Sequence, residues 1–237
     1  MLKAPIQVSR FFSSHARVPT VPPATLRQRR TIFLAGASAA FAVFLTLLAL
    51  VRSNHRLNAD VTTTLRLQRR QHPLLTRVMN NVSWLGFRPQ SLLLPASMIA
   101  LTRFLGFRRD ARFLLIAWGA SFVSFSTKRL VRRPRPDGPD IQVVEADLRD
   151  SSFPSGHVLH YVVFWGFVTY LWYTRPAGRW LRCGPVATML GLIGMVGPSR
   201  IYLGHHWLTD VLASYSLGTG ILLSLIGLRQ RDRKNRS

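Results

Sequence analysis

Four polar residues in the C-terminal third of the chain have the types and spacing that nucleophilic attack on phosphorus requires. Ser199 and Arg200 are followed by His206 and then by Asp210. On a helix, His206 and Asp210 would share a face, because residues four apart lie on the same side. A carboxylate bonded to one imidazole nitrogen fixes the tautomer and leaves the lone pair of the other nitrogen free to attack. We therefore expect His206 to be a nucleophile that Asp210 orients.

The residues around this histidine have different expected roles. Arg200 supplies a fixed positive charge for the oxygens of a phosphate. Asp210 is an acid inside an apolar stretch, where an ionisable group is a functional candidate by default. His205 is expected to point about 100° away from His206 around the helix, because each residue of an α-helix advances by that angle. We therefore predict that His205 takes no part in the chemistry.

A second segment, Pro154-Ser155-Gly156-His157, directly precedes an apolar run, so it lies at the N-terminus of the expected helix. Unpaired backbone N–H groups and the positive end of the helix dipole make that position an anion site. Gly156 allows a phosphate close to the backbone, Ser155 can donate its hydroxyl, and His157 can pass a proton to a leaving oxygen. An alternative interpretation is an ordinary helix cap followed by an interfacial histidine.

A third segment, KRLVRRPRP, extends from Lys128 to Pro136. Lys128 ends an apolar run, and Arg135 follows seven residues later, past a proline. The segment thus delivers two cations to one loop. The alternative is a solvated charge run near a membrane surface, which would consist of Lys128, Arg129, Arg132, Arg133 and Arg135.

Together, the three segments contain what phosphoryl transfer needs. Lys128, Arg135 and Arg200 can surround the nonbridging oxygens of a phosphate, and the serine and glycine of the second segment complete the cradle. His206 attacks phosphorus, and His157 protonates the departing alkoxide. Three fixed cations can supply the charge neutralisation that Mg²⁺ supplies in other phosphoryl-transfer enzymes. We therefore expect neither a metal ion nor a cofactor.

The composition decides what kind of scaffold carries these segments. The 237 residues are 48% hydrophobic, yet 32 Lys+Arg oppose 9 Asp+Glu, for a formal net charge of +23. A nucleic-acid-binding protein would carry its basic residues on one face of the fold. Here they cluster between long apolar runs, the distribution typical of membrane proteins. We expect a lipid bilayer and no nucleic acid as partner.

Apolar runs predict an all-α fold, a bundle of six transmembrane helices. The run 31–51 has no charge, and about 20 apolar residues suffice to cross the hydrocarbon. The other predicted spans are 90–107, 111–127, 158–173, 183–197 and 211–228. The expected organisation is a disordered basic arm (1–30), one six-span domain (31–228) and a basic tail (229–237).

Basic links orient this bundle. With six spans, both termini lie on one side, together with the basic links 103–112 and 175–182, which predicts that this side is cytoplasmic. The three polar segments then share the opposite, extracytoplasmic face. We expect a bacterial plasma-membrane protein with cytoplasmic termini, although an arginine- and serine-bearing start without acids also fits an organelle transit peptide.

The three segments resemble the signature of the type 2 phosphatidic acid phosphatases, a family that shares its core with vanadium haloperoxidases and bacterial acid phosphatases. That signature is Lys, six residues and Arg-Pro, then Pro-Ser-Gly-His, then Ser-Arg, five residues, His, three residues and Asp. Lys128, Arg135, His157, His206 and Asp210 stand at its expected places, and every other position is filled in order. The resemblance covers about residues 31–228.

The resemblance implies a six-helix membrane phosphatase with a phosphohistidine intermediate on His206, an acid at His157 and no required metal. It admits phosphatidic acid, phosphatidylglycerol phosphate, undecaprenyl diphosphate, lipid A and sphingoid phosphates as substrates. A vanadate-dependent haloperoxidase could use the same anion cradle, but those relatives are soluble. A non-catalytic lipid-binding or transport protein would tolerate loss of either histidine, and both are present.

Overall fold

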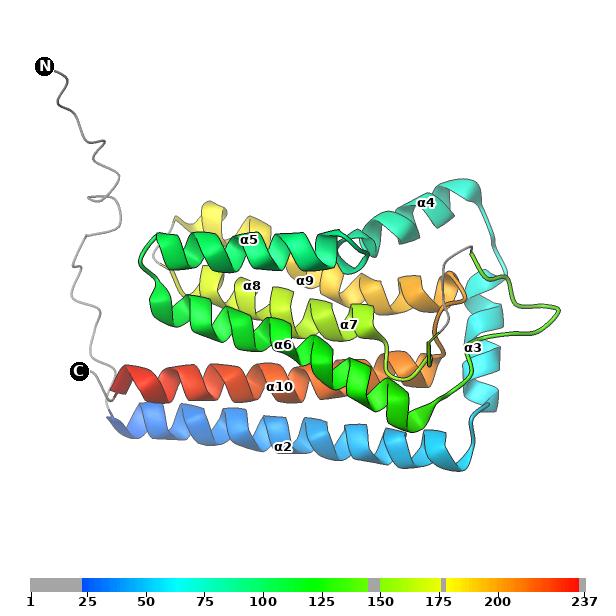
Figure 1. Ribbon diagram of the computed structural model, residues 1–237, viewed down its shortest axis with the longest axis horizontal. Helices are drawn as coiled ribbons and strands as arrows, with labels where there is room; N and C mark the ends of the chain where they lie inside the picture. The colour runs from blue at the N-terminus through cyan, green and yellow to red at the C-terminus, as the bar shows by residue number, and fades with distance from the viewer. Residues whose placement is uncertain (1–22, 145–149, 176–177, 235–237) are drawn as a thin grey trace, which may run out of the picture.

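The structure is a computed structural model that describes residues 23–144, 150–175 and 178–234. All regular secondary structure within these ranges is helical, which confirms the predicted all-α class. Long helices run side by side along the longest axis of the molecule (Figure 1). They are α2 (Pro23–Ser53), α5 (Gln90–Phe104), α6 (Arg108–Val131), α9 (Arg179–Tyr202), α10 (Leu208–Lys234) and a rod made of α7 (Gly156–His160), the π-helical η2 (Tyr161–Trp165) and α8 (Gly166–Tyr173).

The rod formed by α7, η2 and α8 is the core of the bundle. Most of its residues are buried, among them Tyr161, Phe164 and Phe167. Helix α10 packs closely against the rod at Gly218, where a Cβ atom would lie 2.9 Å from the side chain of Val162. Small residues at such crossings let membrane helices approach each other. The segment that begins at Gly156 is therefore held by packing until its last turn, where Trp172 and Tyr173 are exposed.

Shorter helices cover one end of the bundle. Helices α3 (Asn58–Gln68) and α4 (Pro73–Val82) and the 3₁₀ turn η1 (Trp84–Gly86) lie at the end where α9 passes into α10 (Figure 1). The start of α2 and the end of α10 lie at the opposite end. The loop after α6, the start of α7 and the turn between α9 and α10 all reach the end covered by α3 and α4, so the three polar segments meet there.

Three helices among the described residues are long and apolar enough to cross a membrane: Arg30–Ser53, Arg179–Tyr202 and Leu208–Gln230. The sequence predicted six. Helix α5 has only 15 residues, and the uncharged part of α6 is bounded by Arg112 and Lys128. Both are shorter than the roughly 20 residues of an untilted span. The rod is divided among three short segments, so none of them qualifies alone.

Two predicted boundaries differ from the structure. Helix α2 begins at Pro23 rather than at residue 31, because proline suits the first turn of a helix and no glycine or further proline follows before residue 31. Helix α10 continues past residue 228 to Lys234, and Arg229 Nε donates to Asp110 Oδ1 of α6 at 3.0 Å. The remainder of the predicted arm (1–22) and of the tail (235–237) lies outside the described residues.

Candidate active site

The Pro-Ser-Gly-His segment lies at the start of the buried rod, as the sequence predicted. Ser155 is the N-cap of α7, and helical structure begins at Gly156. The Ser155 N–H donates to Ser214 Oγ of α10 at 2.7 Å, which fixes the cap against the neighbouring helix. A Cβ atom at Gly156 would be 3.5 Å from Ser124 Oγ, an ordinary contact, so protein packing alone does not require glycine there.

Arg200 is placed differently from the prediction. The sequence assigned it to a link between spans, whereas the structure has it in the last turn of α9, with 1% of its surface exposed. Its Nη2 contacts Nδ1 of His205, and its guanidinium lies over the ring of Phe87 at 5.3 Å. A helix and two packed side chains therefore hold this cation in one orientation.

Four buried polar atoms in this region have no hydrogen-bond partner within the described part of the chain. They are Ser155 Oγ, His157 Nε2, and Nε and Nη1 of Arg200. Phe87 contacts both the ring of His157, at 4.9 Å between centroids, and the guanidinium of Arg200. A buried group without a partner costs about 1–3 kcal/mol, and more if it is charged. An anion with several acceptor oxygens would satisfy these atoms together.

The sequence analysis missed Ser124. Its side chain is buried on α6, one turn before Lys128, and its hydroxyl has no hydrogen-bond partner among the described residues. Because Ser124 Oγ lies next to Gly156, this hydroxyl faces the same helix N-terminus as Ser155. Only its position four residues before Lys128, on the same face of α6, could have drawn attention to it.

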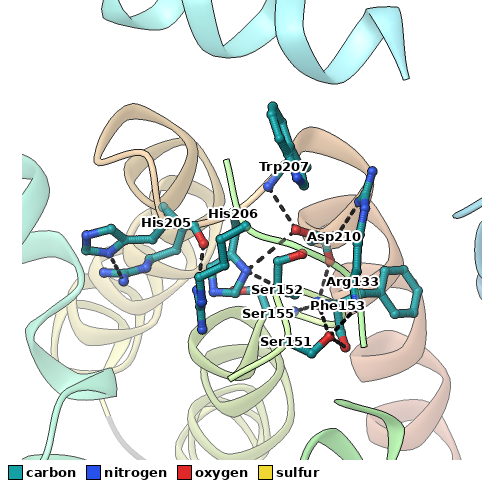
Figure 2. Close-up of polar contacts among 12 residues, drawn as sticks. Arg133, Ser151, Ser152, Phe153, Ser155, His205, His206, Trp207 and Asp210 are labelled. Carbon is teal, nitrogen blue, oxygen red and sulfur yellow. Dashed lines mark hydrogen bonds and ion pairs between the residues drawn. The ribbon is translucent and has the colours of Figure 1, made fainter. Parts of the chain in front are cut away.

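His206 lies in the turn between α9 and α10, so it is not on the same helix as Asp210, because α10 begins at Leu208. Its Nδ1 is 2.7 Å from the carbonyl oxygen of Ser152 and 3.7 Å from Asp210 Oδ2. A carbonyl can only accept, so Nδ1 carries the proton and Nε2 has a free lone pair. The predicted tautomer results, but the hydrogen bond goes to a backbone carbonyl rather than to Asp210 (Figure 2).

The charges of the three predicted cations affect the pKa of His206. Burial lowers the pKa of His206 well below its ordinary value, and the charges of Arg135, Lys128 and Arg200 lower it further. The hydrogen bond to Ser152 opposes these effects without reversing them. The imidazole is therefore neutral at neutral pH, which is the state that can attack phosphorus.

Lys128 and Arg135 are brought together, as predicted, but a carboxylate lies between them. Lys128 Nζ donates to Asp150 Oδ2 at 2.7 Å, and Arg135 Nη2 contacts the other carboxylate oxygen. Burial alone would raise the pKa of Asp150, but the hydrogen bonds and charges of these two cations outweigh it and hold the pKa below its ordinary value. A cavity of about 570 Å³ opens beside the three side chains.

The charge-run interpretation of this segment holds for two of its arginines and is wrong for a third. Arg129 and Arg132 are exposed. The side chain of Arg133 has no exposed surface, and it bonds to two buried carboxylates, Asp60 Oδ2 at 2.6 Å and Asp210 Oδ1 at 2.5 Å (Figure 2 shows the second). The sequence analysis missed Asp60, whose only signal was that it is the one acid among the basic residues 52–89.

His205 points away from Asp210, as predicted, but it is not a bystander (Figure 2). It is 1% exposed, and its Nε2 donates to the carbonyl of Val144 at 2.8 Å while its Nδ1 faces Arg200. Burial, followed by the charge of Arg200, lowers the pKa of His205 to about 4, so this ring is neutral and can accept from the guanidinium. His205 thus helps to hold Arg200.

The imidazole of His157 occupies space that is free because residue 86 is a glycine. A Cβ atom at Gly86 would collide with the imidazole of His157. Gly86→Ala should therefore displace His157 and lower kcat by about 100-fold, since an error near 1 Å in a reacting group can cost that much. Gly119→Ala is the matched control, because the added methyl group would meet no described atom within 4 Å apart from the adjacent residues and the backbone of its own helix. Equal turnover rates for the two purified variants would contradict this role.

Comparisons with known proteins identify the family to which the chain belongs. The family model described as PAP2 superfamily matches residues 110–234. Phosphatidylglycerophosphatase B of Bacillus subtilis is 28% identical over 200 residues, 83% of this chain and 96% of that protein. Decaprenylphosphoryl-5-phosphoribose phosphatase of Mycobacterium tuberculosis is 35% identical over 147 residues, 58% of this chain and 75% of that protein.

A solved structure shows the same architecture. The crystal structure of a transmembrane PAP2 type phosphatidylglycerolphosphate phosphatase from Bacillus subtilis superimposes with a TM-score of 0.71 and 26% sequence identity. The match covers 84% of this chain and 96% of that chain. The arrangement of helices described above is therefore one that a membrane enzyme is known to adopt.

Proposed function

The chain belongs to the PAP2 superfamily and is a membrane phosphatase, and on that premise we propose that it hydrolyses a lipid phosphate through a phosphohistidine on His206 without a metal ion. The observation that carries this proposal is the group of buried atoms on Ser155, His157 and Arg200 that have no hydrogen-bond partner among the described residues. A phosphate bound there would accept from the serine and the guanidinium. It would also lie near His206, whose pKa responds to the charge of Arg200.

The proposed reaction has two displacements at phosphorus. Nε2 of His206 attacks, an N–P bond forms, and the P–O bond to the lipid breaks while His157 donates a proton to the leaving oxygen. The lipid departs as an alcohol, or as a monophosphate if the substrate is a diphosphate. Water then attacks phosphorus and gives a proton to His157 as the N–P bond breaks. Inorganic phosphate leaves, and both histidines return to their starting states.

Fixed cations supply the charge neutralisation in this proposal. Lys128 and Arg135 already bind a carboxylate, that of Asp150, each through a different oxygen. A substrate phosphate would replace this carboxylate, and Arg200 would bind the remaining oxygen from α9. Preorganised cations of this kind stabilise the transition state without rearranging as the charge develops.

The proposed activity can be tested with a panel of lipids. Purified protein should release inorganic phosphate from at least one of phosphatidic acid, phosphatidylglycerol phosphate and undecaprenyl diphosphate, and EDTA should leave the rate unchanged. The lipid with the highest kcat/KM identifies the substrate class. Loss of activity in EDTA that Mg²⁺ restores would contradict the metal-free cradle, and no release from any lipid would contradict the activity itself.

We propose further that six helical rods cross the membrane and that the site faces away from the cytoplasm. In addition to the three long apolar helices, α5, α6 and the central rod run along the same axis (Figure 1). Large apolar side chains on α5 and α6 are exposed, as lipid-facing residues are: Leu92, Leu93, Leu101, Phe104, Leu115, Ile116 and Phe122. Flanking arginines that extend toward the headgroups would compensate for the shortness of these two helices.

This orientation predicts a labelling pattern. In a variant that carries Cys183→Ser, Asp140→Cys should react with an impermeant thiol reagent added to intact cells, because residue 140 is exposed at the site end. Gly178→Cys, exposed in the link before α9, should react only after the cells are broken. The links at the end of the bundle that contains residue 178 are rich in arginine, as cytoplasmic loops of membrane proteins are. The reverse pattern would invert the proposed topology.

A further inference from the structure

Asp60, a buried residue of α3, forms an ion pair with Arg133, and Arg133 also forms an ion pair with Asp210. Resting on the function proposed above, we propose that Asp60 is a positioning residue that offsets the charge of Arg133, so that Asp210 presents net negative charge to His206. Asp60 lies outside the three signature segments and outside residues 110–234, which match the family model.

The three side chains form one closed network. The side chains of Asp60, Arg133 and Asp210 have no exposed surface. Arg133 Nη2 donates to Asp60 Oδ2 at 2.6 Å, and Arg133 Nη1 donates to Asp210 Oδ1 at 2.5 Å. Arg133 Nε donates to the carbonyl of His55 at 2.9 Å. All three nitrogen atoms of the Arg133 guanidinium therefore donate hydrogen bonds, and each carboxylate is paired with this cation.

Asp60 also holds the start of α10. Its Oδ1 accepts from the backbone N–H of Thr209 at 2.8 Å, and both of its oxygens lie 3.0 Å from Thr209 Oγ1. The next residue, Asp210, accepts from the N–H of Trp207 at 2.9 Å through Oδ2. The first turn of α10 is thus tied to α3 through Thr209, and the turn that carries His206 is tied to the first turn of α10 through Trp207 and Asp210.

The charge balance gives Asp60 a role beyond packing. Asp210 and Arg133 alone would be a neutral pair, and such a pair would offer little attraction to a developing positive charge. Two carboxylates and one guanidinium instead carry a net charge of −1. As Nε2 of His206 bonds to phosphorus, positive charge develops on the ring, whose Nδ1 is 3.7 Å from Asp210 Oδ2. A fixed negative charge in a buried site stabilises that change.

The charge hypothesis predicts that a second substitution restores activity. Asp60→Asn makes the network neutral and should lower kcat by about 10- to 100-fold with little change in KM, the loss typical when a partner behind a catalytic ligand is removed. Adding Arg133→Gln returns the network to −1, so Asp60→Asn with Arg133→Gln should be at least about fivefold faster than Asp60→Asn alone. The double variant removes Asp60 and Arg133 together, so neither of these two residues leaves the other as an unpaired buried charge. Asp210 loses its guanidinium partner but keeps the hydrogen bond from the Trp207 N–H.

Asp110→Asn is the matched control. Asp110 is buried on α6 at the opposite end of the bundle and pairs with Arg229 at 2.9 Å. Its substitution should lower the melting temperature and leave kcat of the folded protein unchanged. Rates are therefore measured per mole of folded protein on the best lipid substrate, with thermal unfolding recorded for each variant.

The outcomes separate the two proposals. If the unaltered protein releases no phosphate from any lipid, the proposed function fails. If it is active and Asp60→Asn keeps full kcat, or the double variant is slower than Asp60→Asn, the charge role of Asp60 is overturned. If Asp60→Asn does not fold, the double variant tests the charge role instead. Its kcat should remain within about tenfold of that of the unaltered protein. A folded double variant about 100-fold slower would overturn the proposal.

Discussion

His206→Ala should abolish phosphate release. The variant lacks the Nε2 lone pair that forms the N–P bond, and no other described residue offers a nucleophile with the same arrangement of Lys128, Arg135 and Arg200 around it. The expected loss is at least about 10⁴-fold in kcat, comparable to the loss of one member of a catalytic triad. Quenching in alkaline detergent preserves an N–P bond, so enzyme incubated with lipid that carries ³²P in its phosphate should yield labelled protein only when His206 is present.

Substitutions at two nearby residues serve as comparisons for the loss of activity in His206→Ala. Asp210→Asn should cost less than His206→Ala, about 10²-fold, because the Ser152 carbonyl keeps the proton on Nδ1 even when the carboxylate charge is removed. His205→Ala should reduce activity only partly, through the looser hold on Arg200, and the variant should still form labelled protein. Near-normal turnover by His206→Ala, or a complete loss of label in well-folded His205→Ala, would show that the wrong histidine had been assigned.

Arg200→Ala should produce the second-largest effect. It removes the buried cation whose Nε and Nη1 have no partner among the described residues. Loss of one preorganised donor to a developing charge typically costs about 10²- to 10³-fold in kcat. Vanadate, which can adopt a five-coordinate shape resembling the transition state, should inhibit the unaltered enzyme strongly, and its inhibition constant should rise in parallel in Arg200→Ala.

A second arginine on the same helix is the control for this experiment. Arg182 lies in the first turn of α9, at the other end from Arg200, and its guanidinium stacks over Tyr173 at 5.5 Å. Arg182→Ala removes the same charge from the chain but leaves the cradle intact, so turnover and vanadate inhibition should both be retained. Equal effects of the two substitutions, or an unaltered enzyme that is indifferent to vanadate, would refute the anion cradle.

The candidate site residues could be proposed from the sequence because each of them is a recognisable side chain at a local spacing. His157 follows a helix cap directly, and His206 and Asp210 are separated by four residues. The helix order could be predicted for a similar reason, because apolar runs bounded by arginines leave few alternatives to helices in a bilayer. The all-α class and the helix N-terminus at Gly156 are both confirmed.

Contacts made by the backbone could not be predicted. The acceptor for His206 Nδ1 is the carbonyl of Ser152, 54 residues away in the chain, and every residue type has such a carbonyl. The start of α10 at Leu208, which removes His206 from the helix, depends on the turn that Trp207 and Asp210 close. His206 and Asp210 are close in the structure, with 3.7 Å between Nδ1 and Oδ2, but they are not close for the predicted reason, because they do not share a helix.

Only the tertiary structure decided which charges are paired. Sequence spacing could not distinguish Arg133, which is fully buried, from the exposed Arg132, and nothing local joins Asp60 to Arg133 across 73 residues. The collision that requires glycine at position 86 is likewise a contact between distant segments. Pairing of this kind results from how helices pack, because a buried charge must find its partner wherever the fold brings one within reach. The sequence determined which groups can react, and the packing of α3, α6 and α10 determined the electrostatic environment in which they do so.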